Sequence, residues 1–296
     1  MTTVTDAGTW QLGDLTVNRI GYGTMRLGGN GMAGNSDGAP IDRAHAIRLL
    51  RTAVESGVNH IDTASFYFSA LRSANELINS ALAPYADELV IVTKVGPGRT
   101  PAGEWTRATR PEELRGQVEE NLRQLGRDHL DVVNYRRGRE DSIAEHFGVL
   151  AELREAGLIR HLGISSVKPE HLAEAQAIAP VVCVQNYFSL DRRVAEQNGL
   201  LASCREQGIA FVPFFSISGT QREAAAVATD HETVREVARA HGVTTAQVRL
   251  AWTLAKGPNM LVIPGTTSIE HLGENLAAGQ LRLTEAELAA LDAIDG

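Results

Sequence analysis

Short apolar runs alternate along the chain with segments whose apolar residues recur at helical spacing. Most of the runs are continuously apolar, as in Leu89-Val90-Ile91-Val92, which is typical of strands in a parallel sheet with both faces covered. The predicted strands are Arg19–Gly21, Val58–Asp62, Leu89–Lys94, Leu130–Tyr135, His161–Ser165, Val181–Gln185, Ala210–Phe214 and Leu261–Pro264.

Helix signals fill the gaps between these runs. Asp42 is placed to cap a helix whose apolar face includes Ala46 and Leu50, and Gly57 is placed to end it. Thr244 and Thr284 are each followed three residues later by Gln or Glu, which is the pattern of a capping box. The second box predicts a last helix near the C-terminal end of the sequence.

This order of elements predicts an α/β fold with one domain over residues 1–296. Eight alternations favour an eight-stranded parallel (β/α) TIM barrel with a C-terminal extra helix. A doubly wound sheet is the alternative, but the turn Gly21–Arg26 lacks the third glycine of a dinucleotide-binding turn. Residues Trp10–Val17 predict an N-terminal β-hairpin that turns at Gly13-Asp14 and closes the bottom of the barrel.

Composition narrows the class of partner. The formal net charge is −8 and Lys and Arg do not cluster, which disfavours nucleic acid and anionic membranes. No apolar run reaches the length of a transmembrane helix, and the first residues do not resemble a secretory signal. We therefore expect a cytoplasmic protein with reduced thiols at Cys183 and Cys204. Its oligomeric state is open, and a monomer is compatible with the sequence.

Polar residues at the ends of strands carry the candidate chemistry, because barrels of this kind place their reactive groups there. Asp62 ends the second strand, Tyr67 follows five residues later, and Lys94 ends the third strand. A free phenol is a weak acid, but a neighbouring lysine ammonium favours the phenolate, and a carboxylate keeps that lysine charged. The set predicts a tyrosine that protonates a carbonyl oxygen as a hydride reaches the carbon. Taken singly, each residue has an ordinary structural explanation as a cap or a packing residue.

The segment after the eighth strand predicts an anion site. Thr266, Thr267 and Ser268 stand where a helix begins, and the free N–H groups of a helix start attract phosphate. His271, Glu274 and Asn275 lie in the first two turns of that helix. The alternative interpretation is that Ser268 serves only as the helix N-cap.

Together these motifs resemble the aldo-keto reductase family, from about Trp10 to Ile294. The resemblance implies a nicotinamide cofactor, NADP(H) favoured with NAD(H) as the alternative, a small carbonyl substrate and no metal. The stretches that carry it are Gly23-Thr24-Met25, Asn59-His60-Ile61-Asp62-Thr63-Ala64 with Tyr67, Thr93-Lys94, Gly163-Ile164-Ser165-Ser166, Gln185-Asn186, and Ile263-Pro264-Gly265-Thr266-Thr267 with Glu274-Asn275.

The resemblance also implies roles for individual residues. Asp62, Tyr67 and Lys94 match three of the family's four catalytic residues, and Arg136 stands at the fourth position. The cofactor-binding set would be Gly23, Thr24, Met25, Ser165, Ser166, Gln185, Phe214, Phe215, Ser216, Gly265, Thr266, Thr267, Ser268, His271, Glu274 and Asn275. In that set Ser165, Ser166 and Gln185 would bond the nicotinamide carboxamide, and Phe214 or Phe215 would stack on its ring. The substrate-binding set would be Met25, Tyr67, Trp105 and Arg136.

Three positions depart from the family pattern. Arg136 replaces a His, Ser166 replaces an amide, and His271 stands where an Arg often binds the 2′-phosphate. We expect Arg136 to face the substrate carbonyl, because Val132, Asn134 and Arg136 share one face of their strand. The alternative is that Arg136 turns away and pairs with a surface carboxylate such as Glu140 or Asp141.

One branch of the family resembles the chain most. The stretches Leu130–Asn134, Pro84–Asp87 and Val212–Phe215 are similar to the bacterial pyridoxal reductases, also called pyridoxine 4-dehydrogenases. Pyridoxal/pyridoxine is therefore the leading substrate, and another aldehyde, ketone or sugar of secondary metabolism is the alternative. A cofactor-bound regulatory subunit with little turnover is the rival of another class. The loop Leu27–Pro40 is either a mobile surface loop or a lid.

Overall fold

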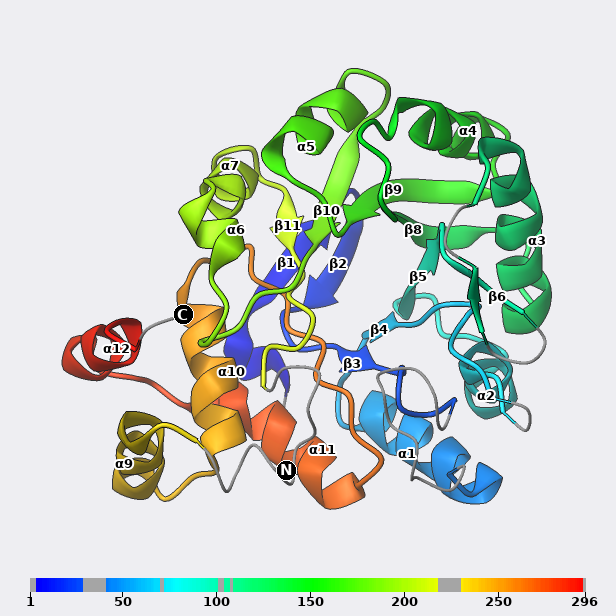
Figure 1. Cartoon of the computed structure of the whole chain (residues 1–296). Helices are drawn as coiled ribbons and strands as arrows, with labels where there is room; N and C mark the ends of the chain where they lie inside the picture. Colours follow the sequence, from blue (N-terminus) through cyan, green and yellow to red (C-terminus); the bar gives the residue numbers. More distant parts are fainter. Residues whose placement is uncertain are drawn as a thin grey trace.

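The central sheet consists of seven parallel strands in the order β11-β10-β9-β8-β5-β4-β3. The computed structural model describes residues 4–28, 41–69, 72–100, 104–106, 109–217 and 230–294. The sheet strands are β3 (Tyr22–Gly23), β4 (His60–Asp62), β5 (Val90–Val95), β8 (Leu130–Arg136), β9 (Ile159–Ser165), β10 (Val181–Gln185) and β11 (Ala210–Phe211). Figure 1 shows the sheet curving around a centre, with helices around its outer side.

The helices follow the strands in alternation, as predicted. They are α1 (Arg43–Glu55), α2 (Ala74–Leu82), α3 (Leu114–Leu125), α4 (Ala144–Glu155), α5 (Pro169–Gln176), α6 (Val194–Gln197), α7 (Leu200–Glu206), α9 (Glu232–His241), α10 (Thr245–Ala255), α11 (Ile269–Ala277) and α12 (Glu285–Asp292). Short 3-10 turns are η1 (Val4–Ala7), η2 (Pro111–Glu113) and η3 (Ala278–Gln280). Asp42 caps α1, and both predicted capping boxes form, at the starts of α10 and α12. None of the helices in the described parts is long and apolar enough to cross a membrane.

The ring of strands is closed by a segment that forms no continuous strand. Val262 N donates to Arg19 O at 2.9 Å on one side, and Leu261 N donates to Phe211 O at 2.9 Å on the other. The eighth predicted strand, Leu261–Pro264, is thus reduced to isolated bridges at Met260 and Val262. Pro264 has no N–H, which limits the ladder at this point. The eight-stranded barrel is confirmed in part, as seven strands and a bridging segment.

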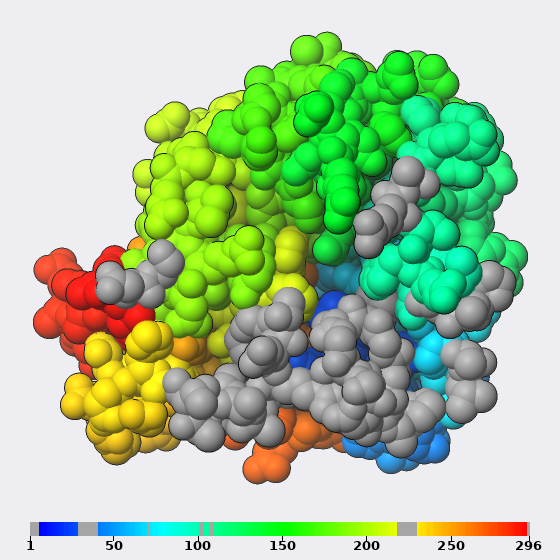
Figure 2. Space-filling view, viewed as in Figure 1, coloured from blue at the N-terminus to red at the C-terminus, as the bar shows by residue number. Residues whose placement is uncertain are grey.

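Several predicted boundaries need correction. The first strand, expected at Arg19–Gly21, is β3 at Tyr22–Gly23, directly after the expected range, although Ile20 bridges to Val262. The strand expected at Ala210–Phe214 stops at Phe211, because Pro213 lacks the N–H that would extend it. At the seam of the ring α11 lies beside α1, and Figure 2 shows their orange and blue surfaces next to each other. Most of the predicted loop Leu27–Pro40 lies outside the described residues.

A β-hairpin closes one end of the ring, as predicted. β1 (Thr9–Leu12) pairs antiparallel with β2 (Leu15–Asn18), and Gly13 in the turn has a φ of +67°. Leu12 and Val17 of the hairpin are fully buried in one cluster with Val92, Val132 and other inward-facing strand residues. This end of the ring is therefore packed with apolar side chains.

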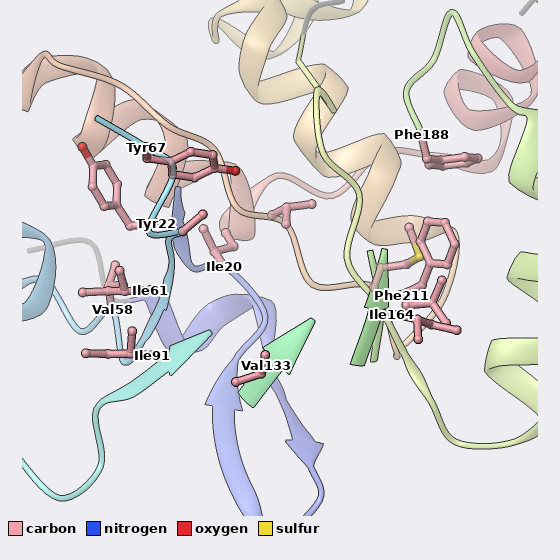
Figure 3. Packing of buried hydrophobic residues seen from close by; sticks show 14 of the residues in the cluster. Ile20, Tyr22, Val58, Ile61, Tyr67, Ile91, Val133, Ile164, Phe188 and Phe211 are labelled. Atoms are coloured by element: carbon pink, nitrogen blue, oxygen red, sulfur yellow. The ribbon is translucent and has the colours of Figure 1, made fainter. Parts of the chain in front are cut away.

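Strand residues alternate between the outside and the inside of the ring. Ile61, Ile91 and Val133 belong to the cluster that packs under the helices, part of which Figure 3 shows. Their chain neighbours, such as Val92 and Val132, belong to the inner cluster. By the same alternation the last inward-facing positions are Asp62, Lys94, Arg136, Ser165 and Gln185. The fold thus gathers polar side chains from five strands at the open end of the ring.

His60 lies two residues before Asp62 on β4, faces the inside of the ring and is neutral there. It is fully buried, neither ring nitrogen has a partner among the described residues, and burial lowers its pKa to about 4. An unfolded chain would protonate this residue near pH 6.5. Stability from neutral His60 is therefore complete above about pH 6.5 and declines as the pH falls toward 4.

We expect this group to lower the free energy of unfolding by about 3 kcal/mol across that window. In His60→Leu the free energy of unfolding should fall less over the same pH interval, and the difference from the wild type should be about 3 kcal/mol. Urea unfolding at several pH values between 7 and 4 would compare the two proteins. Equal pH dependence in both would show that His60 is not responsible.

Candidate active site

Asp62 and Lys94 form a buried ion pair at the open end of the ring. Lys94 Nζ donates to Asp62 Oδ1 at 2.6 Å and to Thr63 O at 2.8 Å, and both side chains are almost fully buried. Burial alone would lower the pKa of Lys94, but the Asp62 carboxylate and the Tyr67 hydroxyl outweigh burial and raise it. Lys94 is therefore a permanent cation over the working pH range.

Tyr67 lies against this cation. Lys94 Nζ is 4.9 Å from the centre of the Tyr67 ring, and the ring also meets Phe66 edge-on at 5.2 Å. The backbone fixes Tyr67 on both sides, since its N–H donates to Ala64 O and its carbonyl accepts from Ala74 N. The structure thus brings together the three residues that the sequence pattern singled out.

Gln185 joins this group from β10. Its Nε2 donates to Asp62 Oδ2 at 2.7 Å, so that Asp62 holds both Lys94 and Gln185. Gln185 Oε1 and Ser165 Oγ are buried without a partner among the described residues. Buried polar atoms are normally hydrogen-bonded, so these two require a polar ligand group. An acceptor and a hydroxyl together match a primary carboxamide, as in a nicotinamide ring.

A pocket opens over these side chains. Residues of the predicted sets that line it are Gly23, Met25, Asp62, Tyr67, Lys94, Arg136, Gln185, Phe214, Phe215, Ser216 and Gly265. Arg26, Ile217, Ile263 and Pro264 complete the lining. Arg26, Ile263 and Pro264 were not among the predicted site residues. Ile263 and Pro264 belong to a stretch that carries the family resemblance, but apolar lining gives no chemical motif.

Arg136 ends β8 and projects a cation into the pocket. Its guanidinium carbon lies 5.4 Å from the centre of the Phe214 ring, and it has no ion pair among the described residues. The carbonyl of Glu140 is instead bonded by Arg137, at 2.7 Å, and Arg137 also bonds Ser166 O. The alternative in which Arg136 pairs with Glu140 or Asp141 is therefore not what the structure shows.

Two residues near the pocket adopt backbone angles that side chains rarely tolerate. Ser166 has a φ of +60° and Phe215 a φ of +61°. Such strain tends to gather at functional sites, where the surrounding structure holds it. Phe215 lines the pocket beside Phe214, and their rings meet at 5.3 Å. Both aromatic residues that we expected to cover a nicotinamide therefore lie at the pocket.

Close backbone contact explains two of the glycines. A side chain at Gly23 would begin 2.6 Å from Ile263 O, and one at Gly265 would begin 2.6 Å from Gly23 O. Thr24, in contrast, is fully buried, and its hydroxyl donates to Asp62 O at 3.1 Å. Its side chain holds the strand end rather than facing the pocket.

A second pocket lies among α9, α10 and α11. His271, Glu274 and Asn275 line it, together with Arg235 and Arg239, which sequence reasoning missed. Ile217 lines both pockets, so the two adjoin. Such an elongated site suits a dinucleotide better than a small molecule alone.

The hydroxyls before α11 are used within the protein. Ser268 Oγ caps α11 by accepting from His271 N, and Thr266 Oγ1 accepts from Ser268 N. Thr267 O is 2.7 Å from His45 Nε2. The side chain of Ser268 is therefore the N-cap of α11, as the alternative interpretation had it.

Trp105 lies beside the first pocket rather than in its lining. It belongs to β7 (Trp105–Thr106), which pairs with β6 (Gly98–Arg99). Its ring meets Phe66 at 5.7 Å and lines a third pocket that also contains Arg136. Within the described ranges, no group of three or more His, Cys, Asp or Glu side chains could hold a metal ion.

Comparisons with known proteins agree with this geometry. Residues 19–296 match the model of the aldo/keto reductase family. Pyridoxine 4-dehydrogenase of Escherichia coli is 43% identical over 295 residues, which cover 97% of this chain and 98% of that protein. An aldo-keto reductase of Klebsiella pneumoniae, solved in complex with NADPH, superposes with a TM-score of 0.76 at 26% identity and covers 94% of this chain and 90% of that chain. The chain belongs to the aldo/keto reductase family.

Proposed function

We propose that this protein reduces small aldehydes with NADPH, that Tyr67 is the proton donor, and that the whole chain works as one reductase domain. The observation that carries the proposal is the buried Asp62–Lys94 pair next to Tyr67, in the pocket that Gln185 and Arg136 also line. Pyridoxal is the leading substrate. Its support is the 43% identity to a pyridoxine 4-dehydrogenase, together with the resemblance of the stretch Leu130–Asn134 to that branch of the family.

When bound, NADPH supplies a hydride to the carbonyl carbon. Negative charge then develops on the carbonyl oxygen, and the Tyr67 hydroxyl gives that oxygen a proton. The Lys94 ammonium stabilises the phenolate that remains, and Asp62 holds Lys94 in place by its 2.6 Å contact. Arg136 places a second cation at the pocket, which favours the same developing oxyanion.

The residues around the two adjoining pockets fit the dinucleotide. Ser165 and Gln185 would bond the nicotinamide carboxamide through their unpartnered oxygens, and Phe214 or Phe215 would cover its ring. Glu274 and Asn275 offer an acceptor and an amide at the far end, where the adenosine would lie. His271 lines this second pocket at the position where relatives often carry an arginine.

Arg239 on α9 is the residue that we expect to bond the 2′-phosphate. Its side chain is exposed, lines the second pocket and bonds Glu232 at 2.7 Å. We expect Arg239→Glu to raise the Kd of NADPH about tenfold, the scale of one charge-assisted hydrogen bond, with little change for NADH. Titration calorimetry would measure both. Arg154→Glu on α4 is the matched control, and an equal loss for both cofactors would contradict a phosphate contact.

One assay tests the proposed function directly. NADPH and NADH oxidation would be followed with pyridoxal and with a panel of neutral aldehydes and ketones. Turnover of pyridoxal above the panel supports the leading substrate, and turnover of other members only would keep the reductase and reject pyridoxal. Tight NADPH binding without turnover of any compound would favour the rival function of a regulatory subunit.

A further inference from the structure

A third pocket adjoins the catalytic pocket at Arg136, and we name it the arginine pocket. Its lining consists of Gly96, Pro97, Trp105, Thr106, Thr109, Arg136, Arg137, Gly138, Arg139 and Glu140. Arg136 lines both the catalytic pocket and the arginine pocket. A molecule with its carbonyl beside Tyr67 therefore has the arginine pocket within reach. The catalytic chemistry described above uses none of its other residues.

The close approach of two strand ends shapes this pocket. Gly96 follows β5 with a φ of +122°, and a side chain there would begin 2.4 Å from Arg136 O. Thr109, which is buried, donates its hydroxyl to Gly96 O, and Gln117 Nε2 donates to Thr109 Oγ1 at 3.3 Å. Gly96 and Thr109 are therefore hydrogen-bonded within the protein. The charged lining residues, which lie within residues 136–140, remain to contact a ligand.

The rim carries an excess of positive charge. Three guanidinium groups, those of Arg136, Arg137 and Arg139, face one carboxylate, that of Glu140. Arg137 bonds only carbonyl oxygens, and Glu140 Oε2 accepts from Gly138 N at 2.7 Å. Neither Arg136 nor Arg139 forms an ion pair within the described ranges. Such a concentration of unpaired cations attracts anions from solution.

Trp105 supplies a partly exposed aromatic ring at the same place. It is 44% exposed, although its ring packs on Phe66, the neighbour of Tyr67, and the guanidinium carbon of Arg99 lies 5.5 Å from the ring centre. An exposed tryptophan next to arginines suits a planar ring that carries a negative group, because the ring stacks while the anion meets the guanidinium.

We propose that the arginine pocket binds an anionic substituent of the substrate, a carboxylate or a phosphate, so that this enzyme favours aromatic aldehydes that carry negative charge. This inference rests on the proposed reductase function and adds the substrate class. Arg136 stabilises the negative charge that develops on the carbonyl oxygen. Arg139 binds the carboxylate or phosphate substituent of the same substrate. A substrate with both a carbonyl and an anion would therefore span the two pockets.

Two matched pairs of aldehydes test the substrate class. Pyridoxal 5′-phosphate against pyridoxal reports on a phosphate, and 4-carboxybenzaldehyde against its methyl ester reports on a carboxylate. We expect the ratio of kcat/KM, anionic over neutral, to reach about ten in at least one pair at low salt, and to fall as salt screens the charges. The pair that shows the preference identifies the anion. Ratios at or below one in both pairs would overturn the proposal.

Variants locate the effect at Arg139. In Arg139→Gln the preferred ratio should fall about threefold or more, and Arg139→Lys should restore most of it, because an exposed lysine keeps the charge. Arg205→Gln on α7 removes an equal charge far from the pocket and should keep the ratio. A wild-type ratio in Arg139→Gln would overturn the assignment. If the wild type reduces none of the four aldehydes, anionic or neutral, the proposed function itself fails, which is a different result from a lost preference.

Discussion

Replacing Tyr67 by phenylalanine should lower kcat for aldehyde reduction at least about a hundredfold, the usual contribution of a general acid. The change removes one oxygen from a ring whose position is set by Phe66, by Lys94 and by two backbone hydrogen bonds. The fold and the cofactor pockets should therefore persist. The Kd of NADPH, measured by titration calorimetry, should stay within about twofold, because the hydroxyl serves the substrate oxygen.

Tyr85→Phe is the matched control for this experiment. Tyr85 donates its hydroxyl to Leu125 O at 2.6 Å, outside the ring of strands, so its loss removes a phenol without touching the pocket. Its kcat should remain close to that of the wild type. If Tyr67→Phe turned over aldehydes at a similar rate, another group would have to supply the proton, and the assignment of Tyr67 would be wrong.

Replacing Arg136 by methionine should cost about tenfold to a hundredfold in kcat, with a much smaller effect on NADPH binding. This loss in kcat is no larger than that caused by removing a typical hydrogen-bond donor to an oxyanion, because Lys94 still places a positive charge at the site. Steady-state kinetics would measure kcat, and titration calorimetry would measure the Kd of NADPH.

Arg136→Lys separates charge from geometry in the same assay. Lysine keeps the cation but not the planar fork of donors. We expect its kcat to lie between those of the wild type and Arg136→Met. An unchanged kcat in Arg136→Met would remove Arg136 from the mechanism.

The interior of the ring was predictable because strand alternation is a local property. β10 has the predicted bounds, Val181–Gln185, and the order of apolar runs placed Asp62 and Lys94 on neighbouring strands. Once strands are parallel and neighbours, their last inward side chains must meet. Periodicity and chain order therefore sufficed to place the ion pair, and proximity to Tyr67 followed from the short loop after β4.

The walls contributed by packing were not predictable in this way. Arg235 and Arg239 reach the second pocket because α9 packs against α10. The spacing of apolar residues within a helix does not indicate which other helix it packs against. The prediction of a continuous eighth strand was wrong for a related reason. The apolar run Leu261–Pro264 indicates burial, but it does not indicate which backbone hydrogen bonds form. Likewise, the sequence left open whether Arg136 would face the pocket or pair with Glu140 or Asp141, because only the turn after β8 decides it, and there Arg137 bonds the carbonyl of Glu140.

The uneven pairing around the ring divides the molecule into a stiff half and a yielding half. β5, β8 and β9 are long and continuously paired, and they carry Lys94, Arg136 and Ser165. At the two ends of the sheet, β3 and β11 have two residues each. Ile20, just before β3, bridges to Val262, and Phe211 of β11 bridges to Met260. Local opening follows the least protected hydrogen bonds. The amides of β3 and β11 should therefore exchange with solvent faster than those of β5, β8 and β9.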